Sequence, residues 1–92
     1  MCLTNYKGII RGAFALAISY LENTTLDKCD RGIRENMIAK YLQDNGVIAN
    51  FDEPQNKAMV TKIVRAGESV YFDNESMDSA LATLSRGLHL KL

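Results

Sequence analysis

The side chains that could serve as nucleophiles or metal ligands are few in this sequence. It holds two cysteines, Cys2 and Cys29, and one histidine, His89. A catalytic nucleophile needs a neighbouring base that is itself held in place, and a zinc site needs closely spaced ligands. The cysteines form no C-x-x-C pair, and His89 has no cysteine or histidine beside it. We therefore expect free thiols and no catalytic residue, metal site or cofactor.

Carboxylates offer a second route to catalysis, through a paired acid and base. Asp27, Asp30 and Glu35 lie close together in the sequence, but basic residues alternate with them. Side chains of opposite charge at such spacing usually form a solvated charged face. The six glycines are scattered, so there is no glycine-rich loop to hold a phosphate group. These patterns indicate a protein that is not an enzyme.

A small anionic ligand such as a nucleotide, held at a subunit interface, is one alternative. Cationic side chains that could hold its phosphates stand at Lys7, Arg11, Arg31 and Arg34, and Tyr41 could stack on its base. All of these residue types are common in ordinary domains. Sequestration of an anionic ligand is therefore a hypothesis that the sequence does not make more specific.

A regulator that binds DNA is a further alternative. Two consecutive helices are predicted over 33–44 and 54–66, and the second carries the basic residues Lys57, Lys62 and Arg65. A helix-turn-helix has a turn of about three to four residues, whereas the connection between these helices is much longer. The eleven basic and eleven acidic residues of the chain cancel, which weakens long-range attraction to a polyanion. We expect no nucleic-acid partner.

Protein interaction is the function that the sequence favours by elimination. From Asp44 to Asp78 there are seven acidic and three basic residues, and such an excess can steer a partner. We expect an adaptor, inhibitor or immunity-type antagonist that occupies the surface of a partner protein. The predicted contact consists of five acidic residues: Asp52, Glu53, Glu68, Asp73 and Glu75.

The N-terminal segment is predicted to form a helix that begins at Thr4 or Asn5 and ends by Asn23. It is apolar on almost every side, so we expect it to be the central element of the fold or part of a subunit contact. Small residues spaced four, three and four apart form a stripe along one face: Gly8, Gly12, Ala15 and Ser19. Because a second helix can approach this stripe closely, we expect it to form part of a homo-oligomer interface.

The next helix is predicted over 33–44, with its cap either at Thr25 or at Asp30 and an Asn-Gly pair as its stop. It is followed by an apolar connector over 47–51. The connector is too short to assign as a strand.

The third helix is expected to begin at Pro54, because proline suits the first turn of a helix. It is expected to run to Ala66 and to close on Gly67, a residue type common at helix ends. The β-branched residues within 57–64 leave a strand as the alternative there.

The last helix is predicted to use Asp73 as its cap, with Phe72 and Met77 as a hydrophobic staple. The preceding residues, from Ser69, are expected to be extended. An apolar seam runs along this helix, and we expect three of its residues to complete the oligomer interface: Met77, Leu81 and Leu84.

These elements predict one domain over residues 1–92 that is mostly α. We expect a small compact bundle of about four short helices, with a minor two-stranded hairpin of 47–51 and 70–72 as a variant. The composition, 47% hydrophobic and 24% charged, is that of an ordinary globular domain. The apolar stretch 13–21 is shorter than the roughly 20 residues that cross a bilayer, so we expect a cytoplasmic protein without a membrane partner.

Overall fold

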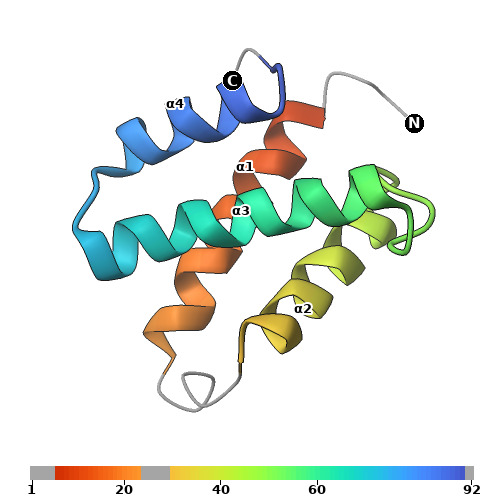
Figure 1. Ribbon diagram of the computed structural model, residues 1–92, viewed down its shortest axis with the longest axis horizontal. Coiled ribbons are helices and arrows are strands. Elements are labelled where there is room, and N and C mark those ends of the chain that lie inside the picture. Colours follow the sequence, from red (N-terminus) through yellow and green to blue (C-terminus); the bar gives the residue numbers. More distant parts are fainter. Residues whose placement is uncertain (1–5, 24–29, 91–92) are drawn as a thin grey trace.

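The computed structural model describes residues 6–23 and 30–90, and the helices within these ranges confirm a mostly α fold. The candidate caps Thr4, Asn5 and Thr25 lie outside the described residues, as do Cys2 and Cys29. The described residues form four helices and no strand (Figure 1): α1 Tyr6–Glu22, α2 Arg31–Asp44, α3 Pro54–Asp73 and α4 Met77–Gly87.

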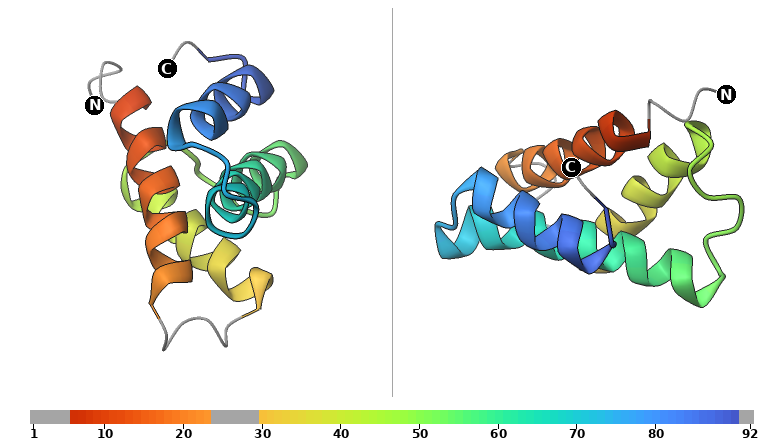
Figure 2. Two further views of the ribbon diagram at one scale, coloured as in Figure 1. Left: turned by 90° about the vertical axis from the view of Figure 1, so that its left-hand side faces the viewer. Right: turned by 90° about the horizontal axis from the view of Figure 1, so that it is seen from above.

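The long helix α3 holds the fold together, because it packs against each of the other three helices. Helix α1 lies behind α3 and crosses it, and α2 runs antiparallel to α1 (Figure 1). Helix α4 folds back along α3, so these two helices lie side by side in front of α1 (Figure 2). The central element is therefore α3, and the N-terminal helix, which we expected at the centre or at a subunit contact, packs against α2 and α3.

The core lies where α1, α2 and α3 meet, and α4 closes it on one side. In α3, the buried residues Val60, Ile63 and Val64 recur at helical spacing and face inward. This stretch is helical, not a strand, because packing of this face outweighs the weak strand preference of β-branched residues. The remaining buried apolar side chains come from all parts of the fold: Ile10, Ala13, Phe14, Ala17, Ile18, Leu21, Ile38, Ala39, Leu42, Ile48, Ala80 and Leu84.

Both ends of α2 follow the local sequence. The side chain of Asp30 caps the helix by accepting a hydrogen bond of 2.9 Å from the backbone N–H of Ile33, which decides between the two predicted caps. The helix ends at Asp44, and Gly46 after it has a φ of 77°, which glycine adopts without strain. The Asn-Gly stop is confirmed.

The predicted hairpin is not seen in the described part of the chain. Residues 47–51 form turns in the connection between α2 and α3, where the side chain of Ile48 is buried in the core. Residues 70–72, the other half of the predicted hairpin, belong to α3. A single short apolar run has no strand to pair with here, so it contributes to the core from a loop.

The end of α3 and the start of α4 differ from the prediction. Helix α3 continues through the buried Gly67 to Asp73, and residues 69–72 are helical rather than extended. The cap of α4 is Ser76, whose hydroxyl accepts a hydrogen bond of 3.0 Å from the N–H of Ser79. Asp73 is therefore the last residue of α3, not a cap, and the expected staple of Phe72 with Met77 stands at the wrong positions for α4.

Candidate functional site

An exposed apolar cluster lies where α3 ends and α4 begins. Tyr71 is 44% exposed, Phe72 65% and Met77 53%, so all three side chains extend into solvent. The rings of Tyr71 and Phe72 meet edge to face, with centroids 5.1 Å apart and planes at 88°. Such edge-to-face ring pairs are favourable beyond the apolar area that they bury. We refer to Tyr71, Phe72 and Met77 as the α3–α4 corner.

The chain turns sharply at the corner. Asn74 ends α3 in the left-handed conformation, with a φ of 60°, and the N–H of Glu75 donates to the carbonyl of Ser69 over 3.1 Å. Ser76 then starts α4. Asparagine is one of the few residue types that tolerate this conformation, which allows a short turn between α3 and α4. The last residues of α3, from Tyr71 to Asp73, are exposed.

Acidic side chains border the corner. Asp73 and Asp78 are exposed, and Glu75 is half-buried and accepts a hydrogen bond of 2.7 Å from the hydroxyl of Ser79. Two of the five predicted contact residues, Asp73 and Glu75, thus lie beside the apolar cluster. Asp52 and Glu53 lie before the opposite end of α3, whose 20 residues span about 30 Å. The acidic residues of the middle segment therefore do not form one surface.

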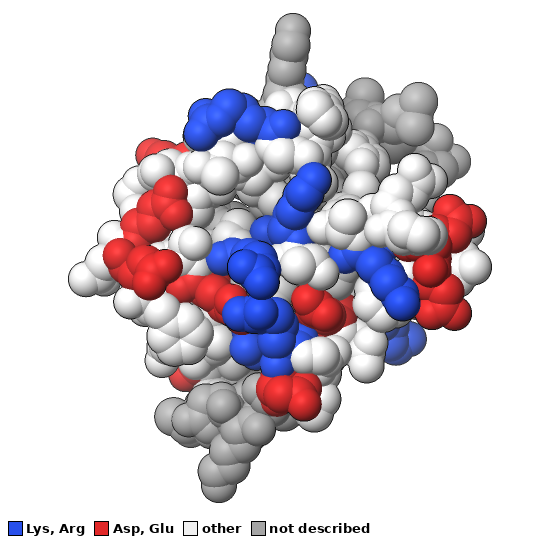
Figure 3. Space-filling model, viewed as in Figure 1, with Lys and Arg blue, Asp and Glu red and all other residues white. Residues whose placement is uncertain are grey.

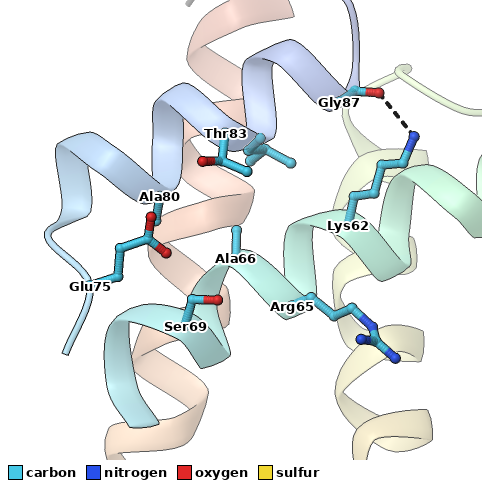
Figure 4. A pocket seen from close by; sticks show the side chains of 9 residues that line it. Lys62, Arg65, Ala66, Ser69, Glu75, Ala80, Thr83 and Gly87 are labelled. Atoms are coloured by element: carbon cyan, nitrogen blue, oxygen red, sulfur yellow. Dashed lines mark hydrogen bonds between the residues drawn. The ribbon is translucent and has the colours of Figure 1, made fainter. Parts of the chain in front are cut away.

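A groove runs between α3 and α4 from the corner toward the end of α4 (Figure 4). Its volume is about 310 Å³, and it is bordered by the stems of Lys62 and Arg65 and floored by small or apolar side chains. The ammonium group of Lys62 donates to the carbonyl oxygen of Gly87 over 2.9 Å and closes one end, while Glu75 stands at the other. We call this the α3–α4 groove, lined by Lys62, Arg65, Ala66, Ser69, Glu75, Ala80, Thr83, Leu84 and Gly87.

Charges are arranged unevenly on the face that carries α3. Basic side chains gather over the middle of this face with a few acidic side chains between and below them, and further acidic side chains lie toward both ends of the molecule (Figure 3). The middle of α3 carries Lys62 and Arg65, and its C-terminal end carries Asp73. A chain without net charge thus presents both signs of charge on one face.

Glu68 binds two arginines of α2 instead of facing solvent. Its carboxylate accepts hydrogen bonds from Arg31 at 2.7 and 2.9 Å and from Arg34 at 3.1 Å. Only 14% of the Glu68 side chain and 11% of the Arg34 side chain is exposed. This cluster joins the start of α2 to α3, so Glu68 is separated in role from the other predicted acidic contact residues.

The two arginines change the acidity of Glu68. Burial of the carboxylate raises its pKa, but hydrogen bonds and charge attraction from Arg31 and Arg34 together outweigh burial and hold the pKa of Glu68 below its ordinary value of 4.5. The hydrogen bonds and charge of Glu68 in turn raise the pKa of Arg31. Glu68 is therefore ionised in the folded protein at neutral pH.

The five residues predicted to hold an anionic ligand do not converge. Arg31 and Arg34 bind Glu68 at the start of α2. Lys7 and Arg11 are exposed near the start of α1, which lies at the opposite end because α1 and α2 are antiparallel. Tyr41, near the end of α2, covers Gly12 of α1. The arrangement separates the cationic groups that one phosphate would need close together.

The small-residue stripe of α1 is largely uncovered. Gly8, Ala15 and Ser19 are exposed, and a Cβ built at Gly8 would have no described atom within 4 Å. Gly12 alone of the stripe is partly covered, by the hydroxyl of Tyr41. Within one chain, the stripe seats a tyrosine side chain rather than another helix.

The predicted seam of α4 is divided between the core and the surface. Leu84 is buried against α3, Leu81 is half-buried, and Met77 belongs to the exposed corner. Of the seam residues predicted at an oligomer interface, Met77 is the one whose side chain is mostly free to contact another protein.

The chain matches no protein-family model, curated protein or solved structure. Its own geometry therefore carries the functional argument. Across the described ranges, no three His, Cys, Asp or Glu side chains are grouped so that they could hold a metal ion. None of the helices described is both long enough and apolar enough to span a bilayer.

Sequence reasoning missed Tyr71 and Phe72 as site residues because it ended the third helix at Gly67. If the helical period is continued from Lys62 and Arg65, positions 69 and 72 fall on the same outward face. An aromatic residue on that polar face was the available signal. It becomes visible only once Gly67 is placed inside the helix.

Proposed function

We propose that this protein is a non-enzymatic protein-interaction module that works through the α3–α4 corner. The observation that carries the proposal is the exposure of Tyr71 and Phe72, whose rings are in contact, at the end of α3 and of Met77 at the start of α4. Contiguous exposed apolar side chains rimmed by polar ones are typical of protein-binding surfaces, and aromatic residues and methionine are enriched there. The acidic residues Asp73 and Asp78 supply the polar rim.

The contact between the rings of Tyr71 and Phe72 is a second observation, besides their exposure, that supports a role in binding. Because the ring of Tyr71 packs edge to face on that of Phe72, this orientation of Phe72 is stabilised before a partner arrives. A side chain already restricted loses less conformational entropy on binding. The corner therefore has the composition and the preorganisation of a small contact surface. We include assembly as a homo-oligomer in the proposal.

The test is affinity capture with tagged protein in its own cells, with an untagged copy also expressed. We expect wild-type protein to retain a protein at near-stoichiometric amount, either another protein or the untagged copy, and Phe72→Ser with Met77→Ser to lose it. Ala15→Ser, a change on the exposed face of α1, is the matched control and should retain it. Capture that survives loss of the corner, with circular dichroism unchanged, would contradict the proposal.

A further inference from the structure

We infer that the partner of the α3–α4 corner is a second copy of this chain, whose Phe72 enters the α3–α4 groove. The inference rests on the proposed function, because it names the protein that the corner contacts. One chain carries both halves of the contact: Phe72 projects from α3, and the groove lies beside the same helix.

The projecting side chain and the groove share one face. Positions 62, 65, 69 and 72 of α3 are spaced three, four and three apart, so they lie along one side of the helix. Lys62, Arg65 and Ser69 line the groove, and Phe72 follows them. A face with both a projection and a matching hollow can form a closed two-fold contact, in which each copy inserts Phe72 into the other.

The groove has the size and chemistry for a phenyl ring. Its hollow of about 310 Å³ exists because small side chains face each other where α3 and α4 pack, among them Ala66 and Ala80. The floor is apolar, with Ala80 and Leu84 buried beneath it. The hydrogen bond from Lys62 to Gly87 closes one end of the hollow. A ring seated here leaves water and contacts apolar atoms.

Charge complementarity favours a second copy over an unrelated partner. Phe72 is followed by the exposed Asp73, whereas Lys62 and Arg65 border the groove on the α3 side, away from the end where Glu75 stands. Among the described residues Arg65 has no hydrogen-bond or ion-pair partner, and Lys62 has given one of its three donors to Gly87. When the Phe72 ring enters, the neighbouring carboxylate of Asp73 comes to the cationic border of the groove. A uniformly acidic or basic partner would match only one of these two features.

The first experiment measures self-association by sedimentation equilibrium from about 1 µM to about 1 mM, the range of weak to moderate complexes. Phe72→Ser removes the projection, and Thr83→Phe fills the hollow from an exposed position on α4. We expect wild-type dimers, and at least about a tenfold increase in Kd for either variant, because each change prevents both insertions of Phe72 in the dimer. Mixing the two variants should recover part of the lost affinity, because the Phe72 that the Thr83→Phe chain keeps fits the open groove of the Phe72→Ser chain and restores one of the two insertions.

The second experiment exchanges the charges. Asp73→Arg and Arg65→Asp should each weaken the dimer, whereas the double variant should recover it because the opposite charges again face each other. Ala15→Arg, on the uncovered stripe of α1, is the control and should leave the dimer unchanged. Circular dichroism of each variant confirms that the fold is retained.

The outcomes separate this inference from the proposed function. A wild-type chain that stays monomeric throughout, or dimers that ignore Phe72→Ser and fail with Ala15→Arg, would overturn the second copy as the partner. If the monomeric chain still captures another protein through Phe72, protein interaction through the corner stands, whereas the inference and the homo-oligomer are both overturned. Dimer affinity recovered by mixing and by charge exchange would support both.

Discussion

Gly67 of α3 lies directly against Ala17 of α1, and a Cβ built at position 67 would come within 2.9 Å of the Ala17 Cβ. The same atom would lie 3.2 Å from the backbone carbon of Ala17 and 3.3 Å from the backbone nitrogen of Ile18. These neighbours belong to a packed helix and cannot move away as the end of a long side chain can. Gly67 therefore sets how closely the two helices approach.

We predict that Gly67→Ala destabilises the fold by about 1–3 kcal/mol, although alanine is the better helix former, because the added methyl group forces α1 and α3 apart. Gly8→Ala is the matched control, since position 8 is open and helical. That change should leave stability unchanged or raise it by up to about 1 kcal/mol. Urea unfolding measures both, and equal effects of the two substitutions would show that Gly67 is not a packing glycine.

The Glu68 cluster, in which the carboxylate of Glu68 binds Arg31 and Arg34, gives a second prediction. Glu68→Gln removes the negative charge between two guanidinium groups, one of which is mostly buried. We expect a loss of about 1–3 kcal/mol, because an uncompensated buried charge is costly. The Nε of Arg34 already has no acceptor within the described structure, so no other group replaces the carboxylate.

The control for Glu68→Gln is Asp44→Asn. Asp44 forms an exposed pair with Lys40 at 3.4 Å, with 61% of its side chain in solvent. Solvent screens such pairs, so no resolvable change in unfolding free energy is expected. If Glu68→Gln and Asp44→Asn lower the unfolding free energy by the same amount, the Glu68 cluster contributes no more to stability than a surface ion pair.

Acid should weaken the Glu68 cluster over a defined range of pH. The pKa of Glu68 is below its ordinary value of 4.5 in the folded protein, so its contribution to stability is complete above that pH. It is lost as the pH falls through the lower pKa of the folded state. The difference in unfolding free energy between wild-type protein and Glu68→Gln should therefore be constant at a pH above the ordinary pKa of 4.5 and should shrink at a lower pH. A difference that grows on acidification would mean that the pKa is raised.

The helices could be predicted from local patterns because their signals are local. Asp30 was one of two expected caps and proves to be the cap of α2, while Pro54 stands in the first turn of α3. Both act on backbone groups within a few residues. Gly67 misled the prediction because a glycine at a helix end and a glycine at a helix crossing look alike in sequence. What distinguishes them is Ala17, fifty residues earlier in the chain.

The site could be predicted only in part for a similar reason. Arg31 and Glu68 are 37 residues apart, and no periodicity pairs them, so they were assigned to different hypothetical sites. Asp73 was expected at a contact surface because of its charge. Phe72, the exposed aromatic residue beside Asp73, was not expected at a contact surface, because its outward position depends on α3 continuing past Gly67.

The left-handed residue at the end of α3 gives the last prediction. Asn74 has a φ of 60°, a conformation that costs most L-residues about 1–2 kcal/mol and glycine almost nothing. We expect Asn74→Ala to lower the unfolding free energy by about 1 kcal/mol and Asn74→Gly to keep or slightly raise it. Asn36→Ala, at an exposed position inside α2, is the control and should not destabilise, because alanine suits a helix interior. Since Asn74 directs the chain from the corner into α4, Asn74→Ala should also broaden the NMR signals of Phe72 and Met77. An alanine at this position that leaves both the unfolding free energy and those signals unchanged would show that the turn does not depend on the left-handed residue.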